Sequence, residues 1–165
     1  EGRKTTYTAS GNVAPAAACT DFAIINGSAS KTVRVVRVVI GGLATAAGAY
    51  AFILAKRSTA NSGGTSSAPA VIPHDSANAA GTAVVLQYSA NPTTGSLVGN
   101  IGSRKTTVTT AAGAIPIIPF IFEFGTANEQ AVVLRGVAQG LALNLNGATM
   151  AGGDLNYEIT WTEED

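Results

Sequence analysis

The stretch Leu141-Ala142-Leu143-Asn144-Leu145-Asn146-Gly147 alternates leucine with smaller or polar residues and then ends in Asn-Gly. Successive side chains of a β-strand point to opposite faces, so this alternation predicts a strand with one buried face. Asn-Gly is typical of a tight turn with positive φ, which places the end of the strand at Asn146. A second stretch alternates in the same way, with apolar residues at Tyr157, Ile159 and Trp161 and polar residues at Glu158, Thr160 and Thr162.

The run from Val33 to Val38 interrupts this alternation. Its two arginines, Arg34 and Arg37, are three positions apart, so a regular strand would turn them to opposite faces. A β-bulge at Val35–Val36 would return both arginines to one face and the valines to the other. A strand buried on both faces is the alternative, but it would have to hide two arginines.

Strand patterns recur along nearly the whole chain, separated by Gly, Pro, Asn and Ser, and no segment has a capped amphipathic helical period. We therefore predict an all-β, single-domain β-sandwich, jelly-roll-like, with about ten short antiparallel strands. The expected strands are Lys4–Ala9, Asp21–Asn26, Thr32–Ile40, Ala49–Arg57, Thr82–Ser89, Ser96–Asn100, Lys105–Thr110, Ile117–Phe124, Ala131–Arg135, Leu141–Asn146 and Leu155–Thr162.

Within this domain, residues 1–20 are expected to form an N-terminal arm or first edge strand, and residues 21–165 the sandwich itself. A second Asn-Gly pair, Asn26-Gly27, predicts another turn with positive φ. The stretch 58–81 is rich in Ser, Ala, Gly and Asn and contains two prolines. A loop of this length is usually functional or flexible, so we expect it to lie over a neighbour or to project outward.

The stretch Val38–Ala55 contains no charge and is bracketed by Arg37, Lys56 and Arg57. Its length is near the lower limit for a membrane-spanning helix. Its glycines and its alanine-rich middle favour two strands joined by a Gly/Ala turn instead, and we expect no membrane association.

The chain of 165 residues is 46% apolar and only 12% charged. Such a surface is poor in charge for a lone monomer, which predicts a homo-oligomer. Ten basic and ten acidic residues cancel, so the overall charge gives no support to nucleic-acid binding. Basic residues precede His74 and acidic residues close the chain, and they could pair within one chain, pair across a subunit contact, or stay apart. The candidate inter-subunit contacts are Lys31, Arg34, Arg37, Glu163, Glu164 and Asp165.

No catalytic, cofactor or metal site is predicted. His74 is the sole histidine and Cys19 the sole cysteine, too few for a usual zinc site. We expect His74 to be a loop residue bonded to Asp75 or to backbone, and Cys19 to be a small buried filler. Glu123 and Glu158 could in principle act as the paired carboxylates of a glycosidase, but acids alternating with apolar residues usually face solvent. The acids at 163–165 could bind calcium loosely, although such a terminus is usually solvated.

Three blocks of the sequence are more distinctive: Gly27-Ser28-Ala29-Ser30-Lys31-Thr32-Val33-Arg34-Val35; Lys56-Arg57-Ser58-Thr59-Ala60-Asn61 with the loop through Pro73-His74-Asp75; and Leu134-Arg135-Gly136 with Gln139 to Gly147, closing on Trp161-Thr162-Glu163-Glu164. Together they cover most of the domain, and they resemble small structural proteins of tailed bacteriophages. The resemblance implies a virion component such as a head decoration, head-fibre or tail-associated protein, commonly a trimer of jelly-roll domains. It supplies no site residues.

Two functional hypotheses follow. The first is a non-enzymatic virion structural protein, a capsid decoration or head-fibre component that acts by oligomeric packing and contacts other virion proteins such as the major capsid protein. The second is a receptor- or carbohydrate-binding β-sandwich module of a phage tail or surface appendage. The second would use Tyr50, Tyr88, Tyr157 or Trp161 as exposed stacking surfaces, whereas their places in strand patterns favour roles in the core.

Overall fold

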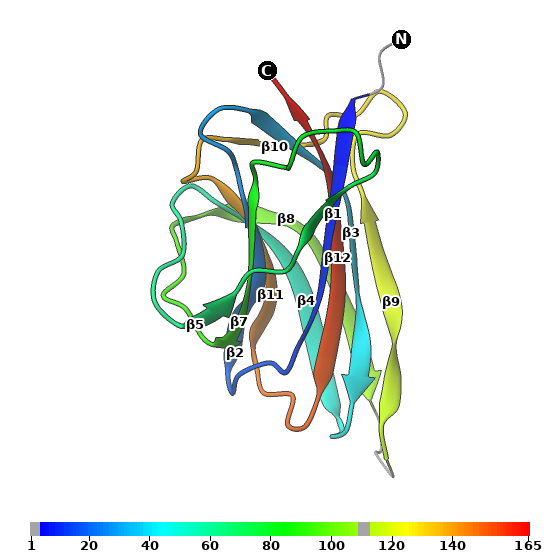
Figure 1. Cartoon of the computed structure of the whole chain (residues 1–165). Coiled ribbons are helices and arrows are strands. Elements are labelled where there is room, and N and C mark those ends of the chain that lie inside the picture. Colours follow the sequence, from blue (N-terminus) through cyan, green and yellow to red (C-terminus); the bar gives the residue numbers. More distant parts are fainter. Residues whose placement is uncertain (1–3, 109–112) are drawn as a thin grey trace.

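A computed structural model describes residues 4–108 and 113–165, which form twelve strands in two antiparallel sheets (Figure 1). The all-β prediction is confirmed, whereas the jelly-roll connectivity stays a prediction. Over these two ranges the chain contains no helix long and apolar enough to cross a membrane. The strands are β1 (Thr5–Val13), β2 (Cys19–Asn26), β3 (Thr32–Ala44), β4 (Gly48–Arg57), β5 (Thr65–Ser67), β6 (Val71–Pro73), β7 (Val84–Ala90), β8 (Leu97–Val108), β9 (Ile115–Glu123), β10 (Val132–Arg135), β11 (Gly140–Ala148) and β12 (Asp154–Glu164).

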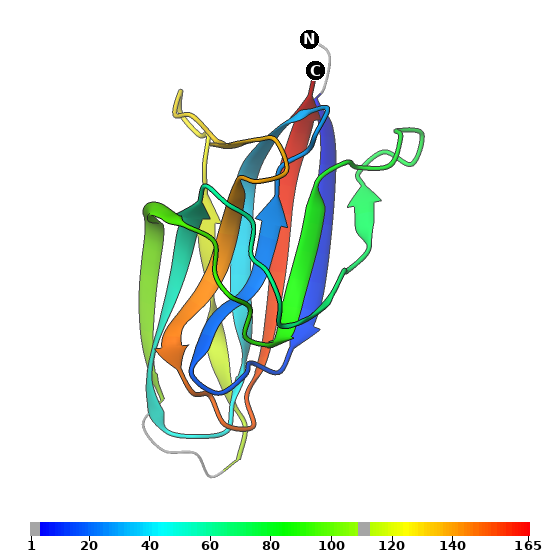
Figure 2. The same ribbon diagram turned by 90° about the vertical axis from the view of Figure 1, so that its left-hand side faces the viewer.

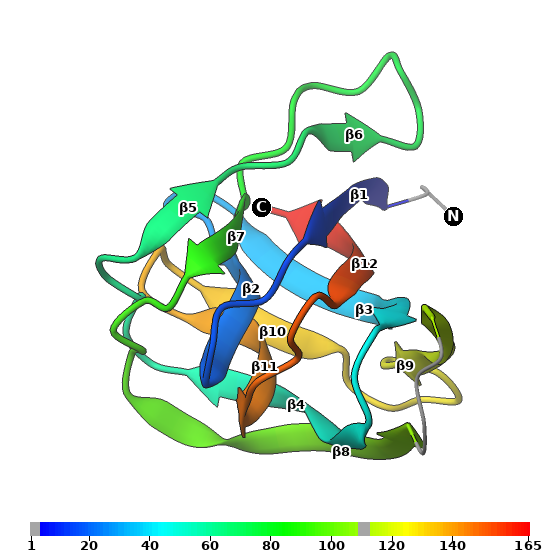
Figure 3. The same ribbon diagram turned by 90° about the horizontal axis from the view of Figure 1, so that it is seen from below.

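The two sheets face each other as the layers of a sandwich (Figure 3). Sheet A has the order β10-β3-β12-β1-β6, and β9 also pairs with β3. Sheet B has the order β5-β7-β2-β11-β4-β8. Within the first twenty residues, Thr5–Val13 form β1, which pairs with β12 along its whole length and with β6 over Tyr7–Ala9.

The predicted bulge is present in β3. In the pairing of β3 with β12, Arg37 lies opposite Thr160 and Val35 opposite Trp161, so Val36 is the extra residue. Val35 is fully buried and Arg37 is exposed, as the bulge requires. The same residue marks a change of neighbour along the other edge of β3, where β10 pairs with Thr32–Val35 and β9 with Arg37–Ala44.

The core lies between the inner faces of the two sheets. Trp161 and Leu143, taken from the two stretches that alternate most clearly, are both fully buried. The Trp161 ring stacks on Tyr7 with 5.9 Å between centroids. The largest fully buried side chains are Trp161, Phe22, Phe52, Ile24, Ile25, Ile40, Leu54, Leu134, Leu141, Leu143, Leu145 and Met150.

Several strand boundaries differ from the prediction. The two strands predicted at Ser96–Asn100 and Lys105–Thr110 fall on one strand, β8, which runs from Leu97 to Val108, and Thr109 and Thr110 lie outside the described residues. The uncharged stretch Val38–Ala55 forms parts of β3 and β4 joined at a short turn, as expected.

Both Asn-Gly predictions were partly wrong. Asn146 and Gly147 have φ of 56° and 75°, as predicted, but β11 continues past them to Ala148 through a shift in its register with β2. Gly27 is not one of the described residues that have a positive φ. It is needed for close approach instead, because a Cβ there would lie 2.5 Å from the carbonyl oxygen of Gly136.

The long segment 58–81 is not a structureless loop. It contains β5, which pairs with β7 at the edge of sheet B, and β6, which pairs with β1 at the edge of sheet A. The segment therefore passes from one sheet to the other and covers an edge of each (Figure 3). Gly63 and Gly64 make the turn before β5 with φ of 64° and 73°.

The outer face of sheet B is covered by the loops that follow β4 and β7 (Figure 2). Beneath them lies a buried ion pair, in which Arg57 Nε and Nη2 donate to the two carboxylate oxygens of Asp21, each at 2.7 Å. Asn61 and Asn144 also donate to this carboxylate, at 2.9 and 2.7 Å, and Arg57 Nη1 donates to the Gly95 carbonyl at 2.9 Å. The network ties both loops to the sheet and satisfies the two buried charges.

Replacing Asp21 by Asn tests this network. The change leaves Arg57 buried without its counter-charge, so we expect the free energy of unfolding to fall by about 3–5 kcal/mol in a urea titration. Asp165→Asn is the matched control, because Asp165 pairs with Lys31 at a position where its side chain is 93% exposed, and its effect should be small. Equal losses in the two variants would contradict a structural role for the buried pair.

Candidate functional site

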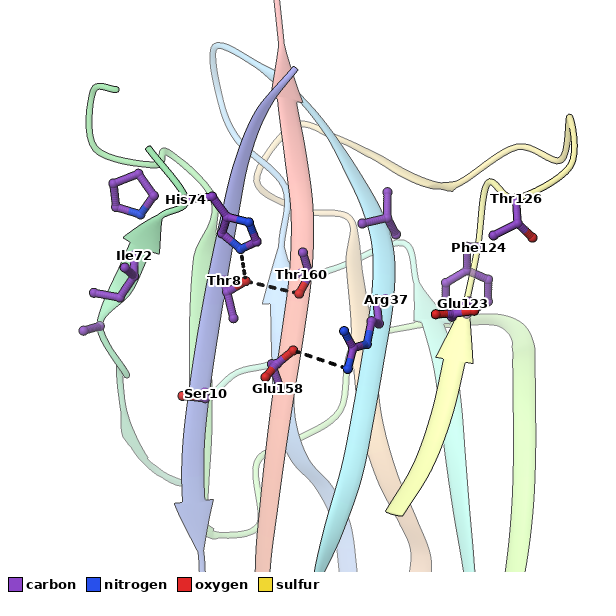
Figure 4. A pocket seen from close by; sticks show the side chains of 13 residues that line it. Thr8, Ser10, Arg37, Ile72, His74, Glu123, Phe124, Thr126, Glu158 and Thr160 are labelled. Atoms are coloured by element: carbon purple, nitrogen blue, oxygen red, sulfur yellow. Dashed lines mark hydrogen bonds and ion pairs between the residues drawn. The ribbon is translucent and has the colours of Figure 1, made fainter. Parts of the chain in front are cut away.

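No loop formed by the described residues covers the outer face of sheet A in the way that sheet B is covered, and this face carries a groove of about 700 Å³ (Figure 4). Its floor is made by outward-facing positions of β1, β12 and β3, because every second residue of these strands points away from the core. One side is formed by β6 with His74 and the other by the end of β9 with the residues after it. The lining residues are Thr8, Ser10, Val36, Arg37, Ala70, Ile72, Pro73, His74, Glu123, Phe124, Thr126, Glu158 and Thr160.

A chain of hydrogen bonds crosses one end of the groove. His74 Nε2 and Thr8 Oγ1 are hydrogen-bonded at 2.7 Å, and Thr8 Oγ1 and Thr160 Oγ1 are 3.2 Å apart (Figure 4). The prediction that His74 bonds to Asp75 or to backbone was wrong for its side chain, because β6 brings the ring against β1. Asp75 instead accepts a hydrogen bond from the Ala77 backbone N–H at 3.0 Å.

Arg37 lies between the two carboxylates that the sequence offered as a catalytic pair. Its Nη2 is 4.0 Å from Glu158 Oε1, and Glu123 is its cross-strand partner on β9. The side chains of Arg37 and Glu158 are 46% and 42% exposed, so both keep unused hydrogen-bonding capacity toward solvent. The groove therefore presents donors and acceptors side by side, which suits binding of a polar ligand.

The structure brings the basic and acidic candidates together within one chain, because β3 and β12 are neighbours. Arg34 Nε donates to Glu164 Oε2 at 3.0 Å, and Lys4 Nζ lies 2.7 Å from Glu164 Oε1. Hydrogen bonds from Lys4 and Arg34 lower the pKa of Glu164. Lys31 pairs with Asp165. Pairing within the chain is thus one role of these residues, and an inter-subunit role for them stays a prediction.

Glu163 has a structural role that the sequence did not indicate. Its carboxylate accepts hydrogen bonds from the backbone N–H groups of Thr82 and Ala83, both at 2.9 Å, and from Trp161 Nε1 at 3.0 Å. The Thr82 hydroxyl also donates to it, at 2.7 Å. Glu163 is 8% exposed, so it anchors the end of the 58–81 segment to the core and offers little surface to another subunit.

The other sequence candidates lie away from the groove. The four aromatic residues considered for sugar stacking, Tyr50, Tyr88, Tyr157 and Trp161, are all buried, with at most 3% exposed, so that form of the binding hypothesis was wrong. Cys19 is buried, and burial raises the pKa of its thiol to about 11. Within residues 4–108 and 113–165, no three His, Cys, Asp or Glu side chains gather where they could hold a metal ion.

The hydroxyl groups of the groove were not predicted from the sequence. The outward row Thr6, Thr8 and Ser10 on β1 alternates with the buried residues Tyr7 and Ala9, and this alternation was a usable signal. The strand that pairs with β1 could not be predicted from the sequence, because β1 and β12 come from opposite ends of the chain. Only their pairing places Thr8 beside Thr160.

Glu163 gives the protein a specific acid sensitivity. Burial alone would raise the pKa of Glu163, but hydrogen bonds from Thr82, Trp161 and Ala83 outweigh burial and lower it below 4.5. A carboxyl group whose pKa is lower in the folded state stabilises that state above the pKa of the unfolded chain. This stabilisation is lost as the pH falls through the folded-state pKa.

Glu163→Gln should therefore be less stable than the wild type at pH 7, and the difference between them should shrink as the pH falls below 4.5. Urea unfolding at a series of pH values, followed by circular dichroism, measures this difference. Glu129→Gln, an exposed control, should show no such trend. A gap between wild type and Glu163→Gln that stays constant with pH would refute the assignment.

The chain was compared with models of known protein families, with curated proteins and with solved structures. None of the three comparisons finds a match.

Proposed function

We propose that this chain is a non-enzymatic structural protein that works by packing against other protein subunits. The resemblance of its sequence blocks to phage structural proteins suggests the virion as its location, as a capsid decoration or head-fibre component. The observation that carries the proposal is an open sheet edge at β8. This edge lies beside β9 along one flank of the sandwich (Figure 3).

β8 is a long strand with one free side. It pairs with β4 along its whole length, and no other strand formed by the described residues pairs with it. Unpaired N–H and C=O groups along such an edge are a template for pairing with another chain. The half of β8 from Leu97 to Gly102 contains neither a charged residue nor a proline, although its pairing with β4 is shifted at Val98 and at Ile101.

The neighbouring edge strand is protected. β9 contains Pro116 and Pro119, which cannot donate to a ladder, and its pairing with β3 is shifted between Phe120 and Ile117. Phe122 of β9 packs under β8, where a Cβ on Gly102 would lie 2.8 Å from its ring. The flank is thus closed internally by side chains, while the backbone edge of β8 remains available to a partner.

Apolar side chains are concentrated on the same two strands. Nine large apolar residues are exposed among those described, and five of them lie on β8 and β9: Leu97, Val98, Ile101, Ile118 and Ile121. Exposed apolar side chains are candidates for an interaction surface. We call these five residues the β8–β9 flank.

The partner of the flank is, in this proposal, a second copy of the chain or another virion protein such as the major capsid protein. The low charge of the sequence supports a homo-oligomer, and the phage resemblance favours a trimer. In a closed trimer, the flank of one subunit would contact a different surface of the next. The non-enzymatic part of the proposal is supported by the engagement of His74 with Thr8 and by the burial of Cys19.

A lysine on the flank should disrupt this packing. We expect the wild type to be oligomeric at micromolar concentration in size-exclusion chromatography with light scattering, and Val98→Lys to shift it toward monomer. Val137→Lys is the matched control, because Val137 is 58% exposed, close to the 62% of Val98, but lies between β10 and β11. It should leave the oligomer unchanged.

Two results would contradict the proposal. A wild type that remains monomeric at all concentrations tested would remove the homo-oligomeric form of the proposal. Equal behaviour of Val98→Lys and Val137→Lys would place the interface elsewhere on the molecule.

A further inference from the structure

The groove on sheet A is the upper part of a longer depression. Below it lies a hollow of about 520 Å³ that shares Ser10 and Glu158 with the groove. A third hollow, of about 450 Å³, shares Asn12 and Asn156 with the second. We call the three together the sheet A trough. It follows β1 and β12, and the part from Thr8 to Asn12 alone spans about 13 Å at the usual strand rise. The trough fits an elongated ligand better than a compact one.

The floor of the trough offers side-chain hydrogen bonds of both kinds. Hydroxyl groups come from Thr8, Ser10 and Thr160, and amide groups from Asn12 and Asn156. Hydroxyls and amides both donate and accept, which matches a ligand whose own groups also do both. Sugar hydroxyls have this property.

Charged groups on the floor can form strong hydrogen bonds to a ligand, and their positive and negative charges are balanced. Arg37 and Glu158 are held at 4.0 Å, longer than a direct hydrogen bond, so each can still bond to a ligand. Hydrogen bonds to ionised groups are stronger than those between neutral groups. Because Glu123 and Asp154 add further negative charge, the lining carries no basic excess. This charge balance disfavours an anionic ligand such as a phosphate or a nucleic acid.

The sheet itself argues against a peptide that binds as an added strand. β12 is hydrogen-bonded to β1 on one side and to β3 on the other, so its backbone groups are already satisfied. Adding a strand requires a free sheet edge, and the trough lies on a sheet face. Recognition in the trough must therefore depend on side chains.

The two rims supply apolar surface. Ile72, on β6, is 58% exposed on one side of the groove, and the half-buried Phe124 lies on the opposite side (Figure 4). Sugar rings combine apolar C–H faces with a polar periphery, so a site with an apolar rim and a hydroxyl-rich floor matches both parts. We propose that the sheet A trough binds a neutral oligosaccharide. This inference does not depend on the β8–β9 flank, because none of the five flank residues lines the trough.

The test is a titration of the ¹⁵N-labelled protein with four neutral glycans: maltohexaose, cellohexaose, chitohexaose and mannohexaose. At least one glycan, at concentrations up to about 10 mM, should give saturable shifts of the amide signals of Thr8, Ser10, Glu158 and Thr160. Glu158→Gln should weaken that binding by about tenfold, because a hydrogen bond to a charged group becomes one to a neutral group.

Glu129→Gln is the matched control, because Glu129 is an exposed acid outside the trough, and its binding should equal that of the wild type. The proposal is overturned if none of the four glycans gives saturable shifts, or if the shifts map outside the trough. Equal effects of Glu158→Gln and Glu129→Gln would also overturn it. So would hexalysine producing the same shifts at lower concentration than any glycan, since the trough would then be a site for cationic peptide.

Discussion

The pairing of β3 with β12 through the bulge at Val36 is the constraint on which the rest of sheet A depends. The ladder runs from Thr32 to Leu43 on β3, and the extra residue shifts the inward–outward alternation of the side chains by one position. Because of this one shift, the buried residues on both sides of Val36 face the same core, while both Arg34 and Arg37 face outward. Without it, one of the two arginines would enter a core that contains Trp161, at a large desolvation cost.

The two outer faces of the sandwich are completed differently. On sheet B the loops after β4 and β7 are held down by the buried pair Asp21–Arg57, so that face is occupied by the protein's own chain. On sheet A the part of the chain that the structure describes forms no such cover, and the ion pairs run along the sheet surface. The 58–81 segment contributes only its β6 part to sheet A, where it raises one rim of the trough. One face is therefore used for stability, and the other is available to a ligand.

The sequence predicted what depends on local pattern and missed what depends on pairing. The bulge followed from the spacing of Arg34 and Arg37, and the burial of Trp161 from simple alternation. β5 and β6 were missed, because each is three residues long and is a strand only by virtue of its partner. The role of Glu163 was missed for the same reason, since its hydrogen-bond donors at Thr82 and Ala83 lie some eighty residues earlier in the chain.

The most direct test of the central constraint is a pair of single-residue deletions in β3, compared by urea unfolding. Deleting Val36 removes the residue that has no partner on β12 and leaves every other side chain on its present face. We expect cooperative unfolding with a loss of about 1–2 kcal/mol, which includes the hydrogen bond from the Phe124 N–H to the Val36 carbonyl. Deleting Val39 turns Ile40 outward, or buries Arg37 if the strand slips, and should abolish cooperative folding. Equal damage from the two deletions would contradict the account.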